Sequence, residues 1–413
     1  MAGTGHCPVP AGENILYYIY MFERTKNLKL SVIKQMEIRA AKFPNTISLA
    51  QGVPSFDTPK CIKRRVELAL RQGVVAKYSL SPGIAELREL IEVKLAEQNM
   101  FYDFEKEILV TAGSIEGITA TILAITDPGD EVIIPEPTYT SYREVIILAG
   151  VTPVYVSLSE DKGWAFELEE YEKAITPRTK AIFYCNPNNP TGTIYSKEQL
   201  LGLAELAEKH NLYLISDEVY KDFIFENGQS IFSLAEMPEL RRRVIRLFSF
   251  SKSYAMTGWR TGYLHSDESI VQEILKVHDC LVTCAPVISQ YAAMGALEMG
   301  DKDVKFFNHE YEKRRDLICA RLDKLSHIFS YVRPESAYYV FPRIIKKDMK
   351  LDDYDCPDSF SWRFALHLLE KTQVAVVPGV AFGPSGENHI RISFGRSEKD
   401  INCAFDRLDK LFL

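Results

Sequence analysis

Short apolar segments alternate with amphipathic segments through the middle of this 413-residue chain. The apolar segments are rich in Val, Ile, Leu and Phe, and the segments between them, such as 197–210, have the polar and apolar spacing of surface helices. Buried strands that alternate with helices form βαβ units, whose strands lie parallel. The sequence therefore predicts an α/β fold with a mostly parallel sheet flanked by helices. The predicted strands are 107–111, 131–135, 179–185, 212–216 and 244–249, and 114–125 is a predicted helix.

Residues that can bind ligands or transfer protons follow four of these strands. They are Ser114, Asn189, Asp217 and Lys252. Because open parallel sheets bind their ligands at the carboxyl ends of the strands, we expect these four side chains to line one site.

Lys252 lies in the run SFSKSYAMTGWRTGY (249–263), among small and aromatic residues. Burial disfavours the charged ammonium, so a lysine in such surroundings can act as a nucleophile near neutral pH. Ser249, Ser251 and Arg260 offer hydrogen-bond donors for a doubly charged phosphate. A lysine beside its own phosphate site indicates pyridoxal 5′-phosphate (PLP), held on Lys252 as a Schiff base.

This run resembles the cofactor-lysine signature of the class I/II aminotransferases, the fold-type I PLP enzymes that are built like aspartate aminotransferase. Further motifs extend the resemblance from about residue 48 to residue 396, in the family's order. The resemblance implies a large PLP-binding domain at 61–304. A smaller α+β domain then combines 28–60 with 305–413, and 1–27 is an N-terminal extension.

The region after the last predicted strand of the large domain begins with a long helical run, 267–299, which we expect to lead out of that domain. The short β-prone segments 338–341, 374–377 and 390–394 follow it. Their order is typical of the smaller α+β unit.

Asp217 and Tyr220 lie in SDEVY (216–220), directly after a predicted strand. An aspartate at the pyridine nitrogen of PLP keeps that nitrogen protonated and makes the ring an electron sink. Tyr220 is then placed to donate to the phenolic oxygen of the ring. The loop NPNNPTG (186–192) resembles the family loop whose central asparagine, here Asn189, shares that oxygen.

The run TAGSIE (111–116) is a turn of small residues that opens a helix, and free amides at a helix start bind phosphate. The resemblance puts the phosphate contacts at Gly113, Ser114 and Ile115. Tyr139 aligns with the aromatic residue that stacks on the cofactor ring, and Tyr142 is the alternative.

Three further residues take roles from the resemblance. Tyr78 resembles the tyrosine that reaches the partner's phosphate across a dimer, which implies a homodimer with shared active sites. Arg391, in HIRISFG (389–395), matches the arginine that holds the substrate α-carboxylate with its planar fork. Gly52 resembles the turn whose backbone approaches the same carboxylate.

The sequence says less about the side chain of the substrate than about the identity of the cofactor. Aspartate-specific enzymes with a second substrate-binding arginine carry it after the long helix, but 279–290 (DCLVTCAPVISQ) contains neither Arg nor Lys. Aspartate, an aromatic or another bulky amino acid therefore remain open as donors, with 2-oxoglutarate as the expected acceptor in a ping-pong reaction. The segments 17–22 and 30–31 are candidates for the mouth of the substrate site.

Two other functions use the same cofactor site. A PLP-dependent β-C–S lyase or a cyclopropane-forming synthase differs in how the substrate carbanion reacts, which these motifs do not determine. A non-enzymatic PLP-binding regulator needs a DNA-binding module, and the extension 1–27 is too short to contain one.

Composition narrows the partners. The net charge of −7 and the isoelectric point near 5.8 argue against nucleic acid or an anionic membrane as a partner. The eight cysteines have no disulfide-framework spacing, and the cluster at 278–284 lacks a second ligand pair for zinc. The apolar run 15–22 is too short to span a bilayer, so we expect a cytoplasmic protein.

Overall fold

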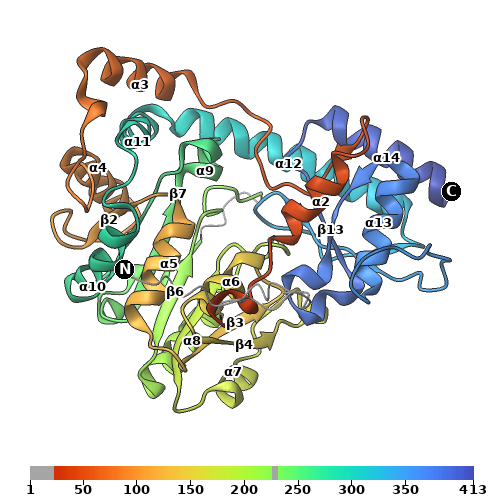
Figure 1. Cartoon of the computed structure of the whole chain (residues 1–413), viewed down its shortest axis with the longest axis horizontal. Helices are drawn as coiled ribbons and strands as arrows, with labels where there is room; N and C mark the ends of the chain where they lie inside the picture. The colour runs from red at the N-terminus through yellow and green to blue at the C-terminus, as the bar shows by residue number, and fades with distance from the viewer. Residues whose placement is uncertain (1–22, 226–230) are drawn as a thin grey trace, which may run out of the picture.

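A seven-stranded sheet forms the centre of the larger part of the molecule in the computed structural model, which describes residues 23–225 and 231–413. Its strands are β2 (Ile108–Thr111), β3 (Glu131–Glu136), β4 (Thr152–Ser157), β5 (Thr179–Cys185), β6 (Tyr213–Asp217), β7 (Val244–Ser249) and β8 (Gly262–His265). They lie in the order β2-β8-β7-β6-β5-β3-β4. Figure 1 labels β2, β3, β4, β6 and β7 of this sheet. Strand β8 runs antiparallel to both of its neighbours, β2 and β7, and the other neighbouring strands are parallel. The sheet is therefore mostly parallel, as predicted.

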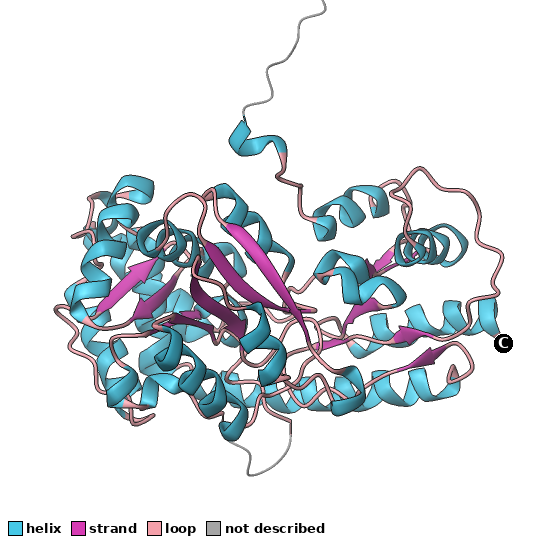
Figure 2. Cartoon of the chain, turned by 90° about the horizontal axis from the view of Figure 1, so that it is seen from below, coloured by secondary structure: helices cyan, strands magenta, loops and turns pink. Residues whose placement is uncertain are grey.

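Helices cover both faces of this sheet (Figure 2). On one face α5 packs against α10 and α6, and α8 packs against α7 near β6. Because both faces are covered, the central strands are buried over most of their length, with Lys180 near the start of β5 as an exposed exception, and their sequences are mostly apolar. The helices of this part are α3 (Lys60–Gln72), α4 (Ala85–Ala96), α5 (Ser114–Ile125), α6 (Thr140–Leu148), α7 (Leu168–Ala174), α8 (Lys197–His210), α9 (Phe250–Ser253), α10 (Glu268–Val282) and α11 (Val287–Met299).

Short strands from both ends of the described chain pair in the remaining part of the molecule. The helices here are α1 (Glu23–Lys26), α2 (Val32–Ala40), α12 (Asp301–Lys324), α13 (Phe360–Thr372) and α14 (Glu398–Phe412), and the strands are β1 (Ile47–Ser48), β9 (Phe329–Ser330), β10 (Tyr339–Val340), β11 (Arg343–Ile344), β12 (Val374–Ala375), β13 (Val377–Pro378) and β14 (Ile390–Ser393). Strand β1 pairs with β12, and β14 lies between β10 and β13. In Figure 1, α2 accordingly lies among the C-terminal elements.

The division into domains stays a prediction. The pairing of β1 with β12 joins the segment 28–60 to the C-terminal elements, in keeping with the expected small domain. Helix α12, however, continues without a break through the expected boundary at 304. The expected extension 1–27 and the apolar run 15–22 lie mostly or wholly outside the described residues.

The prediction of a single long helix at 267–299 is wrong. Two helices, α10 and α11, occupy this stretch and both pack within the larger part of the molecule. Thr283, at a φ of 63°, ends the first helix, and Pro286 precedes the second. Proline cannot donate to a helical carbonyl and disfavours helix at the residue before it, so the helix is interrupted here. Helix α12 is the long helix that leads to the C-terminal elements.

The part of the chain that the structure describes contains no helix long and apolar enough to cross a membrane. It also contains no group of three His, Cys, Asp or Glu residues placed to hold a metal ion. His278, from the metal-like cluster, is buried and lies 3.0 Å from a carboxylate oxygen of Glu116.

A buried ion pair joins the central strands β6 and β7. Arg246 in β7 donates to Glu218, which directly follows β6, over 2.5 Å, and both side chains are at most 3% exposed. The hydroxyls of Ser216 and Ser233 also donate to Glu218. The carboxylate is therefore stabilised only while these partners stay in place, because a buried charge without partners is strongly unfavourable.

We expect Arg246→Met to lower the free energy of unfolding by about 3–5 kcal/mol, the usual cost of removing one partner from a buried pair. Lys276→Met is the matched control, because Lys276 pairs with Glu273 on the surface and is 69% exposed. Its effect should stay below about 0.5 kcal/mol. Urea unfolding followed by circular dichroism measures both, and equal midpoints for the two variants would contradict the account.

Candidate active site

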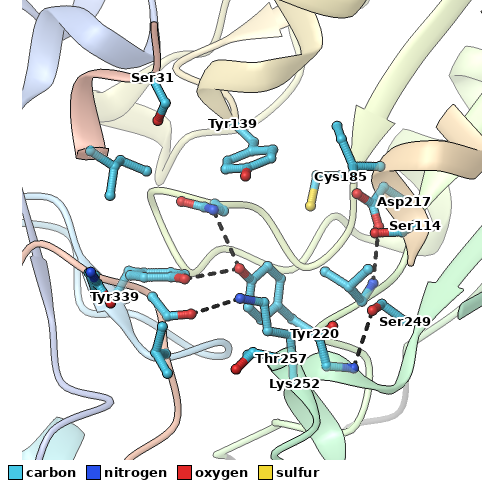
Figure 3. A pocket seen from close by; sticks show the side chains of 18 of the residues that line it. Ser31, Ser114, Tyr139, Cys185, Asp217, Tyr220, Ser249, Lys252, Thr257 and Tyr339 are labelled. Carbon is cyan, nitrogen blue, oxygen red and sulfur yellow. Dashed lines mark hydrogen bonds between the residues drawn. The ribbon is translucent and has the colours of Figure 1, made fainter. Parts of the chain in front are cut away.

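A cavity of about 650 Å³ lies at the carboxyl ends of β2, β5, β6 and β7. The four residues predicted to meet at this edge, Ser114, Asn189, Asp217 and Lys252, all line it (Figure 3). The parallel sheet thus brings together segments that are far apart in the sequence. The other predicted site residues on its wall are Gly52, Ile115, Tyr139, Tyr220, Ser249, Ser251, Arg260 and Arg391, and the alternative Tyr142 also lies there.

Lys252 projects into this cavity from α9, the short helix that Ser249 caps with its hydroxyl. Its Nζ donates to the carbonyl of Gly52 over 2.7 Å. Burial lowers the pKa of Lys252 to about 8, and the positive charges of Arg391 and Arg260 act in the same direction. A substantial fraction of this amine is therefore neutral, and nucleophilic, near neutral pH.

Asp217 ends β6 and is 3% exposed. Its Oδ2 accepts from the Tyr142 hydroxyl over 2.7 Å, and its Oδ1 accepts from the Val219 amide over 3.3 Å. Burial raises its pKa to about 6, although the Tyr142 hydrogen bond opposes the rise. Above that pH the cavity wall carries a carboxylate that has no ion-pair partner among the described residues. Such a group favours a cationic ligand atom.

A candidate anion-binding site lies in the loop between β2 and α5. Gly113 precedes α5 with a φ of 82°, and a Cβ there would lie 2.5 Å from Nη2 of Arg260, so the loop and the guanidinium fit together only with glycine. Arg260 donates to the carbonyls of Thr257 and Ala112 and forms no ion pair with a described carboxylate. The start of α5 and a guanidinium without a carboxylate partner together favour a phosphate.

A second guanidinium belongs to Arg391 in β14, which is 1% exposed. Its Nη1 donates to Oδ1 of Asn189 over 3.1 Å, and its Nη2 donates to the carbonyl of Ala50. Its buried Nε has no hydrogen-bond partner in the structure. Asn189 in turn donates through Nδ2 to the Tyr220 hydroxyl over 3.4 Å. A buried guanidinium with an unused donor can bind a carboxylate that enters the cavity.

The two candidates for the stacking ring occupy different positions. Tyr139 is half-buried and lies across the cavity from Lys252 in the view of Figure 3. Tyr142 is 1% exposed, packs against Phe183 with ring centroids 4.1 Å apart, and uses its hydroxyl on Asp217. The geometry therefore favours Tyr139 as the ring that faces a ligand, while Tyr142 supports Asp217.

Tyr78 does not line the Lys252 cavity. It is 83% exposed and lies at a separate hollow with Ala112, Val282 and Val287. Its predicted contact with a partner subunit stays a prediction.

Sequence reasoning missed several residues on the cavity wall. Tyr339 appeared only as part of a β-prone segment, and nothing local distinguished Cys185 or Thr257. Ser31, from the suggested substrate mouth, does line the cavity, whereas 17–22 lies outside the described residues. For the missed wall residues that belong to α2, the amphipathic sequence of that helix was the only available signal. The α2 residues on the wall are Ile33, Lys34, Glu37 and Ile38.

These residues fit PLP. The anion site formed by Gly113, Ser114 and Arg260 suits the phosphate. The Asp217 carboxylate, which has no ion-pair partner among the described residues, suits a protonated pyridine nitrogen. Lys252, with its lowered pKa, suits the aldehyde. The structure thus provides a donor set for each reactive part of this cofactor.

The comparisons with known proteins agree with this site. The family model described as "Aminotransferase class I and II" matches residues 44–408. An aspartate aminotransferase of Pyrococcus abyssi is 37% identical over 93% of this chain and 97% of its own length. An aromatic-amino-acid aminotransferase of Thermococcus litoralis is 36% identical, with the same two coverages. The solved aspartate aminotransferase of Thermus thermophilus with maleate superposes with a TM-score of 0.86 at 34% identity, over 95% of this chain and 99% of that one.

We expect Lys252 of the cofactor-free protein to be acetylated with a pH midpoint near 8 in competitive labelling followed by mass spectrometry. With this pKa, roughly a quarter of the amine is neutral at pH 7.5, against about 0.1% for an ordinary lysine. Arg391→Met should raise the midpoint, because it removes a positive charge that disfavours the ammonium. The exposed Lys276 serves as the internal reference, and a Lys252 midpoint above 10 would contradict the account.

Proposed function

Because this chain belongs to the class I and II aminotransferases, we propose that it moves an amino group from an α-amino acid to a 2-oxo acid such as 2-oxoglutarate by a ping-pong mechanism. The observation that carries the proposal is the meeting of four groups in one cavity: the Lys252 amine, the Asp217 carboxylate and the two guanidinium groups of Arg260 and Arg391. Each of the four corresponds to one reactive part of PLP or of an amino acid.

PLP, when bound, withdraws electrons from the substrate Cα through its protonated ring. Its phosphate is held by the start of α5 and by Arg260, with Ser249 and Ser251 as further donors from the strand end that carries Lys252. Asp217 keeps the pyridine nitrogen protonated, and Tyr142 keeps Asp217 ionised by donating to it. Tyr139 covers the ring. The contacts of Gly113, Ser114 and Ile115 with the phosphate remain part of the proposal.

Lys252 has two tasks. With PLP bound, its amine would hold the cofactor aldehyde while no substrate is present. Once freed by a substrate amine, Nζ would act as the base for the proton on the substrate Cα and then as the acid that returns it at C4′. A pKa near 8 suits both steps, because the amine must be a base in one step and an acid in the next.

Arg391 binds the substrate α-carboxylate, with the Gly52 backbone nearby and Asn189 holding the guanidinium in place. The cavity wall also includes the apolar side chains of Ile33, Ile38 and Val53, which favour an aromatic or another bulky apolar substrate side chain. Lys34 is the one remaining cation on the described wall, so it would receive the second carboxylate of aspartate or 2-oxoglutarate.

A homodimer with shared active sites completes the proposal. Apolar side chains are exposed along the second half of α3 and the segment that follows it, from Leu68 to Leu80. Such a surface suits an interface between two copies of the chain. Tyr78 extends from this surface, free to reach the partner's phosphate site. A cytoplasmic location accords with the seven described cysteines, all of them free. The exposed apolar side chains are Leu68, Leu70, Val74, Tyr78 and Leu80.

The direct test is a panel of amino acids mixed with the PLP-loaded protein, followed by visible absorbance. We expect an amino-acid donor to abolish the lysine-linked absorbance and to release the matching 2-oxo acid in one equivalent, and 2-oxoglutarate to restore the absorbance. Aromatic amino acids should react at least as fast as aspartate because of the apolar wall. Release of a thiol, pyruvate and ammonia from a cysteine thioether, without transfer to 2-oxoglutarate, would instead identify a β-C–S lyase.

We expect Arg391→Lys to lower kcat/KM for every amino acid and 2-oxo acid by about 10²-fold or more, because lysine keeps the charge but loses the fork that orients Cα–H. The absorbance of the bound cofactor should hardly change. Arg396→Lys, five residues along at an exposed ion pair with Asp400, is the matched control and should leave kcat/KM unchanged. A loss confined to aspartate would show that Arg391 reads the side chain.

A further inference from the structure

Tyr339 lies between the proposed cofactor site and the proposed carboxylate site, yet neither role above uses it. It belongs to β10, is 1% exposed and lines the cavity. Its hydroxyl is 3.0 Å from the Tyr220 hydroxyl, and a dashed line joins the two hydroxyls in Figure 3. Its ring faces Arg391, whose guanidinium carbon lies 4.4 Å from the ring centroid. One side chain therefore contacts a residue of each site.

The hydrogen bonds around Tyr220 limit where its proton can go. A phenol has one proton to donate and two lone pairs that accept. Nδ2 of Asn189 donates to the Tyr220 oxygen over 3.4 Å. The orientation of this amide is fixed, because its Oδ1 accepts from Arg391 over 3.1 Å. One lone pair of Tyr220 is therefore occupied, and the contact with Tyr339 decides what remains.

The Tyr220–Tyr339 hydrogen bond has two directions. If Tyr220 donates, its only proton is used within the wall and cannot reach a ligand. If Tyr339 donates, both lone pairs of Tyr220 are occupied and its proton is left to face the cavity. We propose that Tyr339 is a positioning residue that donates to Tyr220 and so directs the Tyr220 proton toward the phenolic oxygen of PLP; this inference rests on the proposed function.

The surroundings hold the Tyr339 hydroxyl against Tyr220. A Cβ on Gly52 would lie 1.8 Å from the Tyr339 oxygen, so the backbone at Gly52 leaves this hydroxyl little room to turn away. The neighbouring Tyr338 donates to the Gly52 carbonyl over 3.0 Å, and its hydroxyl lies within reach of the Tyr339 hydroxyl. The Gly52 carbonyl also accepts from Lys252. Of the two adjacent phenols, Tyr339 is the one whose hydroxyl is hydrogen-bonded to Tyr220.

Donation by Tyr339 strengthens the donation that Tyr220 makes, because hydrogen bonds in a chain polarise one another. A stronger donor stabilises negative charge on the phenolic oxygen. The nitrogen that joins Lys252 to the cofactor then loses its proton at a lower pH, since it no longer needs that proton to neutralise the oxygen. Removing the Tyr339 hydroxyl should therefore raise the pH midpoint of the visible absorbance change.

Tyr339→Phe tests this inference, because it keeps the ring next to Arg391 and removes only the hydroxyl. In the PLP-loaded protein we expect the absorbance midpoint to rise by about 0.5 pH unit, the size of one neutral hydrogen bond. The kcat should fall several-fold, and KM for the amino acid should change by less than about twofold because the ring remains. Tyr171→Phe is the control, because Tyr171 is fully buried and its hydroxyl has no partner in the structure. Its midpoint should match the wild type.

A double-mutant cycle shows whether Tyr339 acts through Tyr220. In a Tyr220→Phe background, Tyr339→Phe should produce no further shift of the midpoint. An equal shift in both backgrounds would overturn the inference, and so would an unchanged midpoint in a folded Tyr339→Phe protein. In either case the wild-type titration still supports the proposed function. A wild-type protein without lysine-linked absorbance would contradict both.

Discussion

The register of the parallel strands β5, β6 and β7 is the constraint on which the site depends. Cys185 at the end of β5 is paired with Asp217, and Asp217 is paired with Leu247 two residues before the end of β7. Neighbouring strands lie about 4.8 Å apart, so this pairing brings the residues after three strands to one edge within about 10 Å of one another. A shift of one residue would turn Asp217 to the other face of the sheet.

The charges of the side chains that line the Lys252 cavity explain which ligands it can bind. Arg260 and Arg391 carry positive charge into the cavity without forming ion pairs with described carboxylates, and the same charges help to lower the pKa of Lys252. Asp217 lies near them, buried and ionised above a pH of about 6. The site therefore has an excess of positive charge that suits an anionic cofactor and an anionic substrate. Burial, together with these two positive charges, makes Lys252 a nucleophile.

Local patterns were enough to predict the elements that carry the site. The bounds of β5, β7, α5 and α8 agree with the predictions because each is a single apolar strand or amphipathic helix with clear ends. The predicted residues next to strand ends, such as Asp217 and Lys252, do meet in one cavity. Their chemical roles stay predictions.

Contacts between distant segments could not be predicted from local patterns. Asn189 and Arg391 are about 200 residues apart, and their hydrogen bond depends on how β14 lies against the large sheet. Tyr339 reaches Tyr220 for the same reason, and its sequence shows only a β-prone segment. The sequence at 267–299 predicts one long helical run, whereas Thr283, at a positive φ, ends α10 and Pro286 precedes α11.

We propose that Lys252 is the residue that binds the cofactor at this strand edge. Borohydride reduction of the PLP-loaded protein, followed by peptide mapping, identifies that residue. We expect a single reduced adduct, on the peptide that contains Lys252, and no adduct in Lys252→Ala protein that still binds PLP through its phosphate. An adduct on another lysine, such as Lys34 at the mouth of the cavity, would contradict it.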